Sequence, residues 1–309
     1  MKILITDPEY FSEPAREIMR GVGEVIAKKY TNEELLGEVA DAHALAIRVT
    51  TVVDRGVLDA AHSLKIIGSA TTGINHIDVE YAEAKGVRVV SLPGHNTIST
   101  AEFTFATLLS LVKRIPWAHQ HTLSGAWDRA RFMGTELSGK TLGLIGFGRI
   151  GRAVATYAAA FGMAVVYADP YLEVDVARDA GARKVSLQEL LAIADIVSVH
   201  AFLSSETESM IGYEELKTMK PTAVIINAAR GNIVNEDALL TALQEGIIAG
   251  AALDVFGNEP LAQDNPLIHY AANHDNLILT PHIGGSSREA VEQSGIYVAE
   301  KIREVLQTL

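Results

Sequence analysis

Three side chains with the chemistry of acid–base catalysis follow strand-like segments in the second half of the chain. Arg230, Glu259 and His282 come after residues 223–227, 248–253 and 277–279, respectively. Because an open parallel sheet binds ligands at the carboxyl ends of its strands, the three side chains are expected to converge on one crevice. An arginine binds a carboxylate through two parallel hydrogen bonds. A histidine exchanges protons near neutral pH, and a carboxylate bonded to it fixes its tautomer and raises its pKa.

A glycine-rich run indicates what else the crevice could hold. The run Gly146-Phe147-Gly148-Arg149-Ile150-Gly151 stands between a strand-like segment, residues 140–145, and a helix-like segment, residues 152–161. The first glycine permits a tight turn, the second leaves the backbone open to a pyrophosphate, and the third lets the helix lie close to the sheet. Phosphates would then face the free N–H groups and the positive end of the helix dipole. The run therefore predicts a dinucleotide site.

Asp169 indicates which dinucleotide is expected. It follows the apolar segment 163–168, eighteen residues beyond Gly151, where this kind of fold places an acid that binds the adenosine ribose hydroxyls. Its charge would repel a 2′-phosphate, and the residues that follow, 170–172, provide no arginine to bind one. We therefore expect NAD rather than NADP. The alternative is a glycine-rich turn in another doubly wound sheet, such as the nucleoside site of a methyltransferase.

Together these features suit the oxidation of an alcohol that stands beside a carboxylate. Arg230 would hold the carboxylate, and His282 would take the hydroxyl proton as a hydride leaves for the cofactor. Taken singly, each residue also has an ordinary interpretation: Arg230 as a surface ion-pairing residue, Glu259 as a loop carboxylate, His282 as a turn histidine. Their joint position after successive strands favours the catalytic interpretation.

The composition limits the classes of function. With 309 residues, the chain is expected to form about two domains, because single cores stop growing at roughly 250–300 residues. A net charge of −12 argues against binding to nucleic acid or to an anionic membrane. The chain contains no cysteine, which excludes disulfides and thiolate metal sites, and its histidines lack metal-ligand spacing. We expect neither a signal peptide nor a membrane span, and therefore a cytoplasmic protein.

Strand-like and helix-like segments alternate along the chain, which predicts parallel sheets with helices on both faces. In the first third, strands are expected at residues 2–6, 44–49, 65–69 and 87–90, and helices at 12–20, 32–41 and 78–85. The pattern restarts after residue 140, with strands expected at 141–145, 163–168, 196–200, 223–227, 248–253 and 277–279. The sequence thus predicts an α/β fold with two doubly wound parallel-sheet domains.

Three further segments bear on how the chain is organised. Residues 99–102, Ser-Thr-Ala-Glu, have the pattern of a capping box, which predicts a helix from there to about Lys113 as the link between domains. A final amphipathic helix, residues 287–309, could return to the first array. Residues 116–135 show neither a helical nor a strand period, yet contain Trp117, Trp127, Phe132 and Met133. So much apolar surface on an irregular segment predicts a partner, and we favour a homodimer over a lid.

Longer motifs make the chain similar to a known family. They are residues 134–141 (GTELSGKT), 226–231 (INAARG), 252–256 (ALDVF) leading to Glu259-Pro260, and 280–285 (TPHIGG). Over almost its whole length the chain resembles the D-2-hydroxyacid dehydrogenases, and among them the short phosphoglycerate dehydrogenases. The resemblance implies a flavodoxin-like substrate domain made of residues 1–96 and 286–309. Into this domain a Rossmann NAD-binding domain, residues 97–285, would be inserted, with a homodimer built on it.

The same resemblance implies roles for individual residues. Arg230 is implied as the carboxylate anchor, Glu259 as the partner of the histidine, and His282 as the acid–base. Besides Gly146, Gly148, Gly151 and Asp169, the implied cofactor contacts are Thr72, Arg149, Ile150, His200, Ala201, Thr207, Ala228, Ala229, Arg230, Asp254, His282 and Gly284. The implied substrate contacts are Arg48, Ala70, Thr71, Thr72, Gly73, Arg230 and His282. Backbone N–H groups of residues 70–73 would bind the substrate carboxylate.

Two positions depart from the family pattern. Phe202 stands where the family commonly has a proline, so the wall of the nicotinamide pocket is expected to be shaped differently. Ser69 stands where phosphoglycerate enzymes often carry an arginine, which leaves Arg48 and Arg129 as candidate partners for a distal phosphate. Feedback control of the kind found in longer relatives is not expected.

The expected activity is therefore the NAD-dependent interconversion of a small anionic D-2-hydroxy acid and its 2-keto acid, with 3-phosphoglycerate as one candidate substrate. Glyoxylate, hydroxypyruvate and sulfolactate-type or longer 2-hydroxy acids are alternatives within this class. An alternative of another class is an NAD(H)-sensing binding protein, similar to the transcriptional corepressors that share this fold. A pure sensor, however, would not need Arg230, Glu259 and His282 together.

Overall fold

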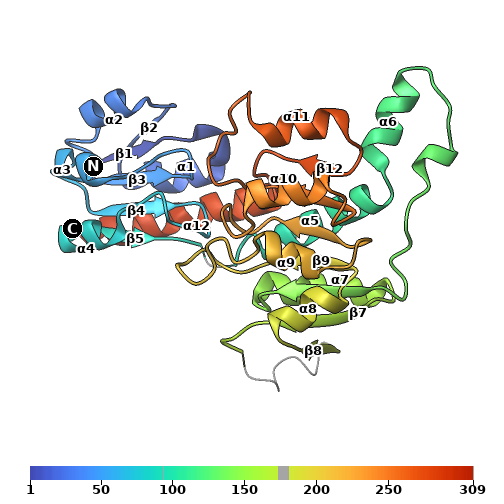
Figure 1. Cartoon of the computed structure of the whole chain (residues 1–309). Coiled ribbons are helices and arrows are strands. Elements are labelled where there is room, and N and C mark those ends of the chain that lie inside the picture. Colours follow the sequence, from blue (N-terminus) through green and yellow to red (C-terminus); the bar gives the residue numbers. More distant parts are fainter. Residues whose placement is uncertain (93, 173–180, 309) are drawn as a thin grey trace. The chain divides into compact units, whose positions relative to one another are not determined.

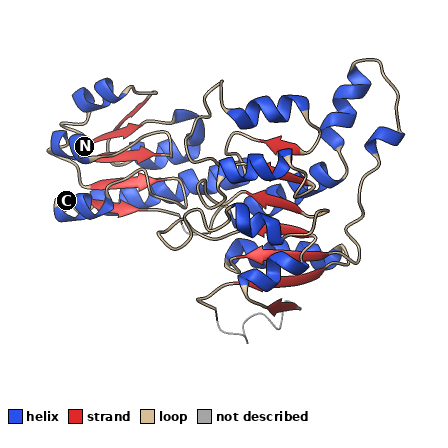
Figure 2. Cartoon of the chain, viewed as in Figure 1, coloured by secondary structure: helices blue, strands red, loops and turns tan. Residues whose placement is uncertain are grey.

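Two parallel sheets, each with helices on both faces, form the frame of the chain (Figures 1 and 2). This computed structural model describes residues 1–92, 94–172 and 181–308. The chain divides into a terminal unit, Met1–Asn96 with Ser286–Leu309, and a central unit, Thr97–Gly285. The predicted fold class, with two doubly wound parallel sheets, is confirmed.

Strands of the terminal unit alternate their apolar side chains between two hydrophobic cores. Ile3 and Ile5 are fully buried in one core, whereas Leu4 is fully buried in the other. The strands among the described residues are β1 (Lys2–Ile5), β2 (Glu24–Ala27), β3 (Ala44–Ile47), β4 (Ile66–Ser69) and β5 (Arg88–Val90). Their order, β2-β1-β3-β4-β5, is the flavodoxin-like order of doubly wound sheets.

Helices cover both faces of this sheet. The described helical segments are η1 (Pro8–Tyr10), α1 (Glu13–Arg20), α2 (Asn32–Glu38), α3 (Arg55–Ala60), α4 (Val79–Ala84) and α12 (Arg288–Leu306). Helices α1 and α12 share the core of Ile3 and Ile5, and α2 to α4 share the core of Leu4. Helix α12 packs on α1 and β4, so the last helix returns to the first array, a possibility that the sequence left open.

Two elements of the terminal unit differ from the sequence-based prediction. Strand β2 is an edge strand whose side chains are half-buried or exposed, so it lacks the apolar signal that identifies the inner strands. Helix α3 has six residues and one of them is a glycine, so its helical period is short and weak. The other strands and helices of this unit lie within a few residues of their expected positions.

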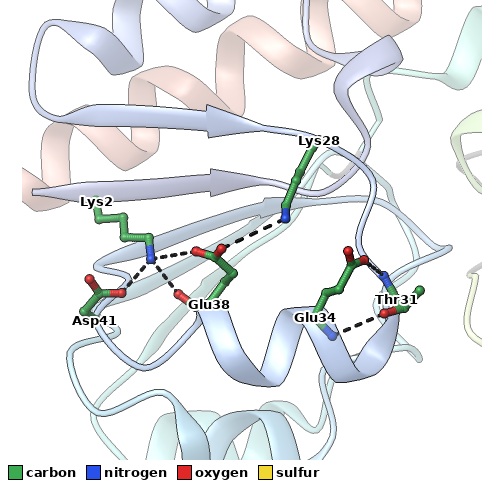
Figure 3. Close-up of polar contacts among 6 residues, drawn as sticks. All are labelled: Lys2, Lys28, Thr31, Glu34, Glu38 and Asp41. Atoms are coloured by element: carbon green, nitrogen blue, oxygen red, sulfur yellow. Dashed lines mark hydrogen bonds and ion pairs between the residues drawn. The ribbon is translucent and has the colours of Figure 1, made fainter.

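Lys2, at the start of β1, forms hydrogen bonds and ion pairs with residues at and just after the end of α2 (Figure 3). Its ammonium donates to the Glu38 carbonyl at 2.9 Å, the Glu38 carboxylate at 3.0 Å and Asp41 Oδ1 at 2.7 Å. These contacts, the bond to Asp41 first, raise the pKa of Lys2 against the opposing effect of burial. At the other end of α2, Thr31 and Glu34 form a reciprocal capping box.

Replacing Lys2 by methionine is therefore expected to lower the free energy of unfolding by about 1 kcal/mol, because the side chain keeps its stem and loses three charge-assisted contacts. Urea denaturation measures the change. Lys29→Met is the matched control, because Lys29 pairs with Glu9 on the exposed surface and its loss should have little effect. Equal effects of the two substitutions would contradict the role given to Lys2.

The central unit contains a longer parallel sheet. Its described strands are β6 (Thr141–Ile145), β7 (Ala164–Ala168), β8 (Ala182–Lys184), β9 (Ile196–Val199), β10 (Val224–Asn227), β11 (Gly250–Leu253) and β12 (Leu277–Leu279). Their order, β12-β11-β10-β9-β6-β7-β8, is that of dinucleotide-binding folds with one added strand. The order changes direction at β6, so a crevice opens beyond its carboxyl end. The edge strand β8 has three residues and is not signalled by the sequence.

The helices of this unit pack on both faces of its sheet. Those among the described residues are α5 (Thr97–Val112), α6 (Ile115–Leu123), η2 (Ala130–Phe132), α7 (Arg149–Ala160), α8 (Leu187–Ile193), α9 (Tyr213–Thr218), α10 (Glu236–Gln244) and α11 (Pro266–Asn273). Within the described residues, no helix has the length and apolarity that crossing a membrane requires.

Two predictions for this unit are wrong in detail. Helix α5 begins at Thr97, so Ser99 lies inside its first turn and donates its hydroxyl to the Gly284 carbonyl at 3.0 Å instead of capping the helix. Residues 115–123 form helix α6, although most of this segment was expected to be irregular. Pro116 lies in the first turn, where proline is common at the start of helices. Helix α6 and the segment after it stand out from the rest of the unit (Figure 1). Trp127 and Met133 on this segment are 80% and 78% exposed.

Candidate active site

A short hydrogen bond joins the histidine and the glutamate expected to act together. Nδ1 of His282, which follows β12, lies 2.6 Å from Oε2 of Glu259, in the loop after β11. The other oxygen of Glu259 accepts the Phe256 N–H at 2.9 Å. With the glutamate ionised, Nδ1 is the donor, so the Nε2 atom of His282 is the one left to exchange a proton with a ligand.

The electrostatics of Glu259 favour its charged form. Burial opposes ionisation, but the hydrogen bonds from His282 and Phe256 and the positive charges of His282 and Arg230 outweigh it. The pKa of Glu259 therefore lies below its ordinary value. The side chains of His282 and Glu259 are each about one-third exposed, 33% and 32%, so a solute can reach the pair.

Asp254 holds the loop that carries His282. Its buried carboxylate accepts the Thr280 hydroxyl at 2.6 Å, the Ile283 N–H at 2.9 Å and the Gly284 N–H at 2.7 Å. His282 lies between these anchors with φ of 54°, in the left-handed region. Burial raises the pKa of Asp254 although the three hydrogen bonds lower it. Asp254 was expected beside the nicotinamide; the structure gives its carboxylate a positioning role, and a nicotinamide contact stays a prediction.

Arg230 reaches the same region from the neighbouring strand. It follows β10, which pairs with β11, and Asn227 holds its carbonyl through a 2.9 Å hydrogen bond from Nδ2. Gly231 allows a close approach of the next loop, because a Cβ there would lie 2.0 Å from the Phe256 backbone. Burial lowers the pKa of Arg230 and the charge of Glu259 opposes that shift. An arginine remains charged in this setting. The structure thus brings Arg230, Glu259 and His282 together.

The glycine-rich turn has the geometry that a pyrophosphate needs. Gly146 has a φ of 92° at the end of β6. A Cβ at Gly151 would lie 2.5 Å from the Gly146 carbonyl, so α7 can approach the turn only with glycine there. A Cβ at Gly148, by contrast, would meet nothing within 4 Å, which leaves open space at the N-cap of α7. Arg149 and Ile150 follow in the first turn of this helix.

Asp169 lies beside this turn at the end of β7. One of its oxygens accepts the Phe147 N–H at 2.9 Å and the other accepts the Tyr171 N–H at 2.9 Å. Each carboxylate oxygen has a second lone pair, so the group can still bind ribose hydroxyls. Asp169 thus holds the turn in place and faces the space where the ribose is expected.

A largely apolar pocket of about 680 Å³ opens between these elements, a size that suits a nucleoside. Of the expected cofactor residues, it is lined by Gly146, Gly148, Asp169, His200, Ala201 and Thr207. Tyr171, Lys184, Phe202 and Glu206 also line it and were not assigned there from the sequence. The described residues contain no group of His, Asp or Glu side chains able to hold a metal ion.

Phe202 lines the pocket together with Asp169 and Tyr171, on the side where the adenosine is expected. The reason is the sheet order: β9 and β7 are both neighbours of β6, so the residues that follow them flank the glycine turn. Sequence distance alone does not reveal this neighbourhood. The effect of Phe202 on the nicotinamide wall stays a prediction.

The expected substrate residues of the terminal unit also lie together. Arg48 and Ala70 follow the paired residues Ile47 and Ser69 of β3 and β4. Thr71, Thr72 and Gly73 continue the loop after β4. The Arg48 guanidinium lies 4.0 Å from the Tyr10 ring centroid, and burial lowers its pKa. Within the described residues no carboxylate forms an ion pair with Arg48. Thr72 Oγ1 bonds to Asn96 Oδ1 at 2.8 Å.

His200 provides a test of burial in this pocket. Removal of the ring from water lowers its pKa to about 4, so the folded protein keeps it neutral while the unfolded chain takes up a proton below about pH 6.5. Its contribution to stability is complete above pH 6.5 and is lost as the pH falls toward 4. The loss is about 3 kcal/mol. Between pH 7 and pH 4.5, urea denaturation should show a smaller loss in the free energy of unfolding for His200→Asn than for the wild type. The exposed His119→Asn, as control, should match the wild type.

Comparison with known proteins identifies the family of the chain. Residues 105–284 match the family model of the D-isomer specific 2-hydroxyacid dehydrogenase NAD binding domain. The D-3-phosphoglycerate dehydrogenase of Methanocaldococcus jannaschii is 46% identical over 309 residues, which are 99% of this chain and 58% of that protein. The chain therefore spans just over half the length of this curated relative.

Two solved structures share the fold over nearly their whole length. The TT0316 protein of Thermus thermophilus is 37% identical, with a TM-score of 0.91 over 100% of this chain and 97% of that one. The D-lactate dehydrogenase of Aquifex aeolicus, complexed with NAD and lactic acid, is 30% identical, with a TM-score of 0.86 over 100% of this chain and 95% of that one. The chain belongs to the D-isomer specific 2-hydroxyacid dehydrogenase family.

Proposed function

We propose that this chain catalyses the NAD-dependent interconversion of a small D-2-hydroxy acid and its 2-keto acid. The observation that carries the proposal is the 2.6 Å hydrogen bond between His282 Nδ1 and Glu259 Oε2, next to the charge of Arg230. An imidazole oriented by a carboxylate, beside a fixed cation, suits proton exchange on an anionic substrate.

Each of the three residues has a separate task. Arg230 holds the substrate carboxylate through its planar guanidinium. Nε2 of His282 takes the proton of the C2 hydroxyl during oxidation and returns it during reduction. Glu259 stabilises the imidazolium that results and keeps Nε2 directed outward. When bound, the nicotinamide accepts or supplies the hydride at the same carbon.

The central unit is proposed as the cofactor domain. Gly146, Gly148 and the first turn of α7 would hold the pyrophosphate, and Asp169 the adenosine ribose. Lys184 lines the same pocket, but its ammonium donates to the Leu172 carbonyl. With Asp169 and Glu206 lining the same pocket, the charges favour NAD over NADP.

The terminal unit is proposed as the substrate domain. The backbone of residues 70–73 would bind the carboxylate, and Thr72 would contact the cofactor. Arg48 is the proposed partner of a distal phosphate, because its guanidinium is stacked on Tyr10 and forms no ion pair within the described residues. D-3-phosphoglycerate, the substrate named for the curated relative, is accordingly the first candidate substrate.

One observation favours a smaller, unphosphorylated substrate as the second candidate. Ser69 is fully buried and bonds to Thr71 Oγ1 at 2.7 Å and to His76 Nε2 at 3.1 Å, so it contributes no charge to a phosphate site. Glyoxylate and hydroxypyruvate, which carry no distal anion, are therefore the alternative substrates to test. Sulfolactate-type acids carry a distal sulfonate and are tested beside the phosphorylated acid. Arg129, exposed near η2, stays a candidate for binding a distal anion.

A panel of 2-keto acids with NADH tests the proposal through the loss of nicotinamide absorbance. We expect oxidation of NADH with at least one acid, and greater kcat/KM for 3-phosphohydroxypyruvate than for glyoxylate. Arg48→Gln should lower kcat/KM for the phosphorylated acid and spare that for glyoxylate. If no acid of the panel oxidises NADH, the proposed activity is wrong, and the sensor hypothesis takes its place.

The assembly and location are also part of the proposal. The exposed Ile115, Leu123, Trp127 and Met133 on α6 and the segment after it support a homodimer through the central unit. Sedimentation should show a dimer that Trp127→Ser weakens. Dependence on NAD supports a cytoplasmic location, which cell fractionation tests.

A further inference from the structure

Two exposed aromatic rings face each other at the mouth of the 680 Å³ pocket. Tyr171, after β7, and Phe202, after β9, are 66% and 62% exposed. Their ring centroids are 6.2 Å apart and their planes differ by 28°. Exposed apolar surface that lines a concave pocket is typical of a ligand-binding site. Their place beside Asp169 indicates a planar ligand.

Polar contacts fix the two segments that carry these rings. The Tyr171 hydroxyl donates to Glu206 Oε2 at 2.6 Å, and its N–H donates to Asp169 at 2.9 Å. The hydroxyl of Thr207 donates to the Phe202 carbonyl at 2.7 Å and accepts the Ser204 N–H at 2.8 Å. The bond between Tyr171 and Glu206 thus links the segment after β7 to the segment after β9.

The spacing of the rings fits an aromatic guest after a small movement. A planar ring between two others needs about 7 Å, twice the ~3.5 Å contact distance of carbon atoms. The observed 6.2 Å falls short of that by less than 1 Å. Since a rotation about the side-chain bonds of two exposed rings supplies such a movement, the pair can open without a change in the sheet.

We propose that Tyr171 and Phe202, linked through Glu206, form an aromatic clamp that closes on the purine of the dinucleotide. The inference rests on the proposed NAD dependence and adds the residues that determine cofactor affinity. The apolar faces bind the base, while the negative charges of Asp169 and Glu206 at the same mouth discriminate against a 2′-phosphate. The clamp acts on binding and takes no part in proton transfer.

Binding measurements on two reduced cofactors test the clamp. NADH carries the purine, whereas dihydronicotinamide mononucleotide lacks the whole adenosine half. Titration of nicotinamide fluorescence should show that Phe202→Ala and Tyr171→Ala each raise the Kd for NADH about tenfold, because one stacking face is lost. The Kd for the mononucleotide should stay unchanged. Tyr171→Phe, which keeps the ring and loses the bond to Glu206, should raise the Kd for NADH only a few-fold.

Tyr213 supplies a matched control. Its hydroxyl also donates to a glutamate at 2.6 Å, Glu245, but it lies on α9 and does not line the pocket. Tyr213→Ala should leave the Kd for both cofactors unchanged. Wild-type affinity for NADH in Phe202→Ala would overturn the clamp and leave the proposed function intact, provided that the variant still oxidises NADH. A wild-type protein that binds no NADH would overturn both.

Discussion

Replacement of His282 by asparagine is expected to lower kcat about a thousandfold while the Kd for NADH stays nearly unchanged. General acid–base catalysis by a positioned side chain contributes about 10²–10⁴-fold. Asparagine is chosen because His282 has a φ of 54°, and asparagine adopts this left-handed conformation more readily than alanine. The substitution therefore removes the imidazole and keeps the loop held by Asp254. Steady-state kinetics and a fluorescence titration of NADH measure the two quantities.

The partner variant Glu259→Gln separates orientation from proton transfer. Glutamine has nearly the same size but carries no charge to stabilise an imidazolium, so we expect kcat to fall about a hundredfold. Because the pKa of Glu259 lies below its ordinary value of about 4.5, the carboxylate is still ionised at that pH. The wild type should therefore keep the stabilisation of the imidazolium by Glu259 above about pH 4.5. Glu245→Gln, at the end of α10, is the control. If the kcat of the His282→Asn variant stays within tenfold of the wild-type value, His282 is not the acid–base.

Replacement of Arg230 by lysine is expected to lower kcat/KM for the 2-keto acid by about one to two orders of magnitude. Lysine keeps the charge but cannot form the two parallel hydrogen bonds with a carboxylate, and a charged hydrogen bond contributes about 1.5–3 kcal/mol. Most of the loss should appear in KM, because the interaction is present before the hydride moves. The Kd for ADP-ribose, which lacks the nicotinamide, should not change.

Arg55→Lys is a suitable control for this substitution, because Arg55 pairs with Asp78 on the exposed surface of α3 and α4. Both variants should melt within a few degrees of the wild type, which circular dichroism can verify. An unchanged kcat/KM for Arg230→Lys would mean that another group holds the substrate carboxylate. Arg48 would then be the first to test.

The features that could be predicted from the sequence depend on neighbours in the chain. Inner strands such as β6 and β10 are short apolar runs with clear limits, so their positions match closely. The turn from Gly146 to Gly151 is also local, because the close approaches that require glycine there are to residues of the same turn and to the end of the adjoining strand. The placement of Arg230, Glu259 and His282 after β10, β11 and β12 followed from the rule that parallel strands end at one edge.

The features that were missed depend on contacts distant in the chain. The edge strands β2 and β8 lack a fully buried core of their own, and pairing with β1 and β7 defines them. The positioning role of Asp254 could not be predicted, because its carboxylate accepts the backbone N–H groups of Ile283 and Gly284, about 30 residues away in the chain. The neighbourhood of Tyr171 and Phe202 needs the sheet order, because two strands on either side of β6 bring them together.

His282, Glu259 and Arg230 are proposed to act on a substrate that receives a hydride at C2. The most direct measurement is a single incubation of NADH, deuterated at the transferred position, with the preferred 2-keto acid, followed by chiral separation and mass spectrometry of the product. We expect a D-2-hydroxy acid with one deuterium at C2 from the wild type, and a rate about a thousandfold lower from His282→Asn. A product of L configuration, or one without deuterium at C2, would contradict the proposed reaction.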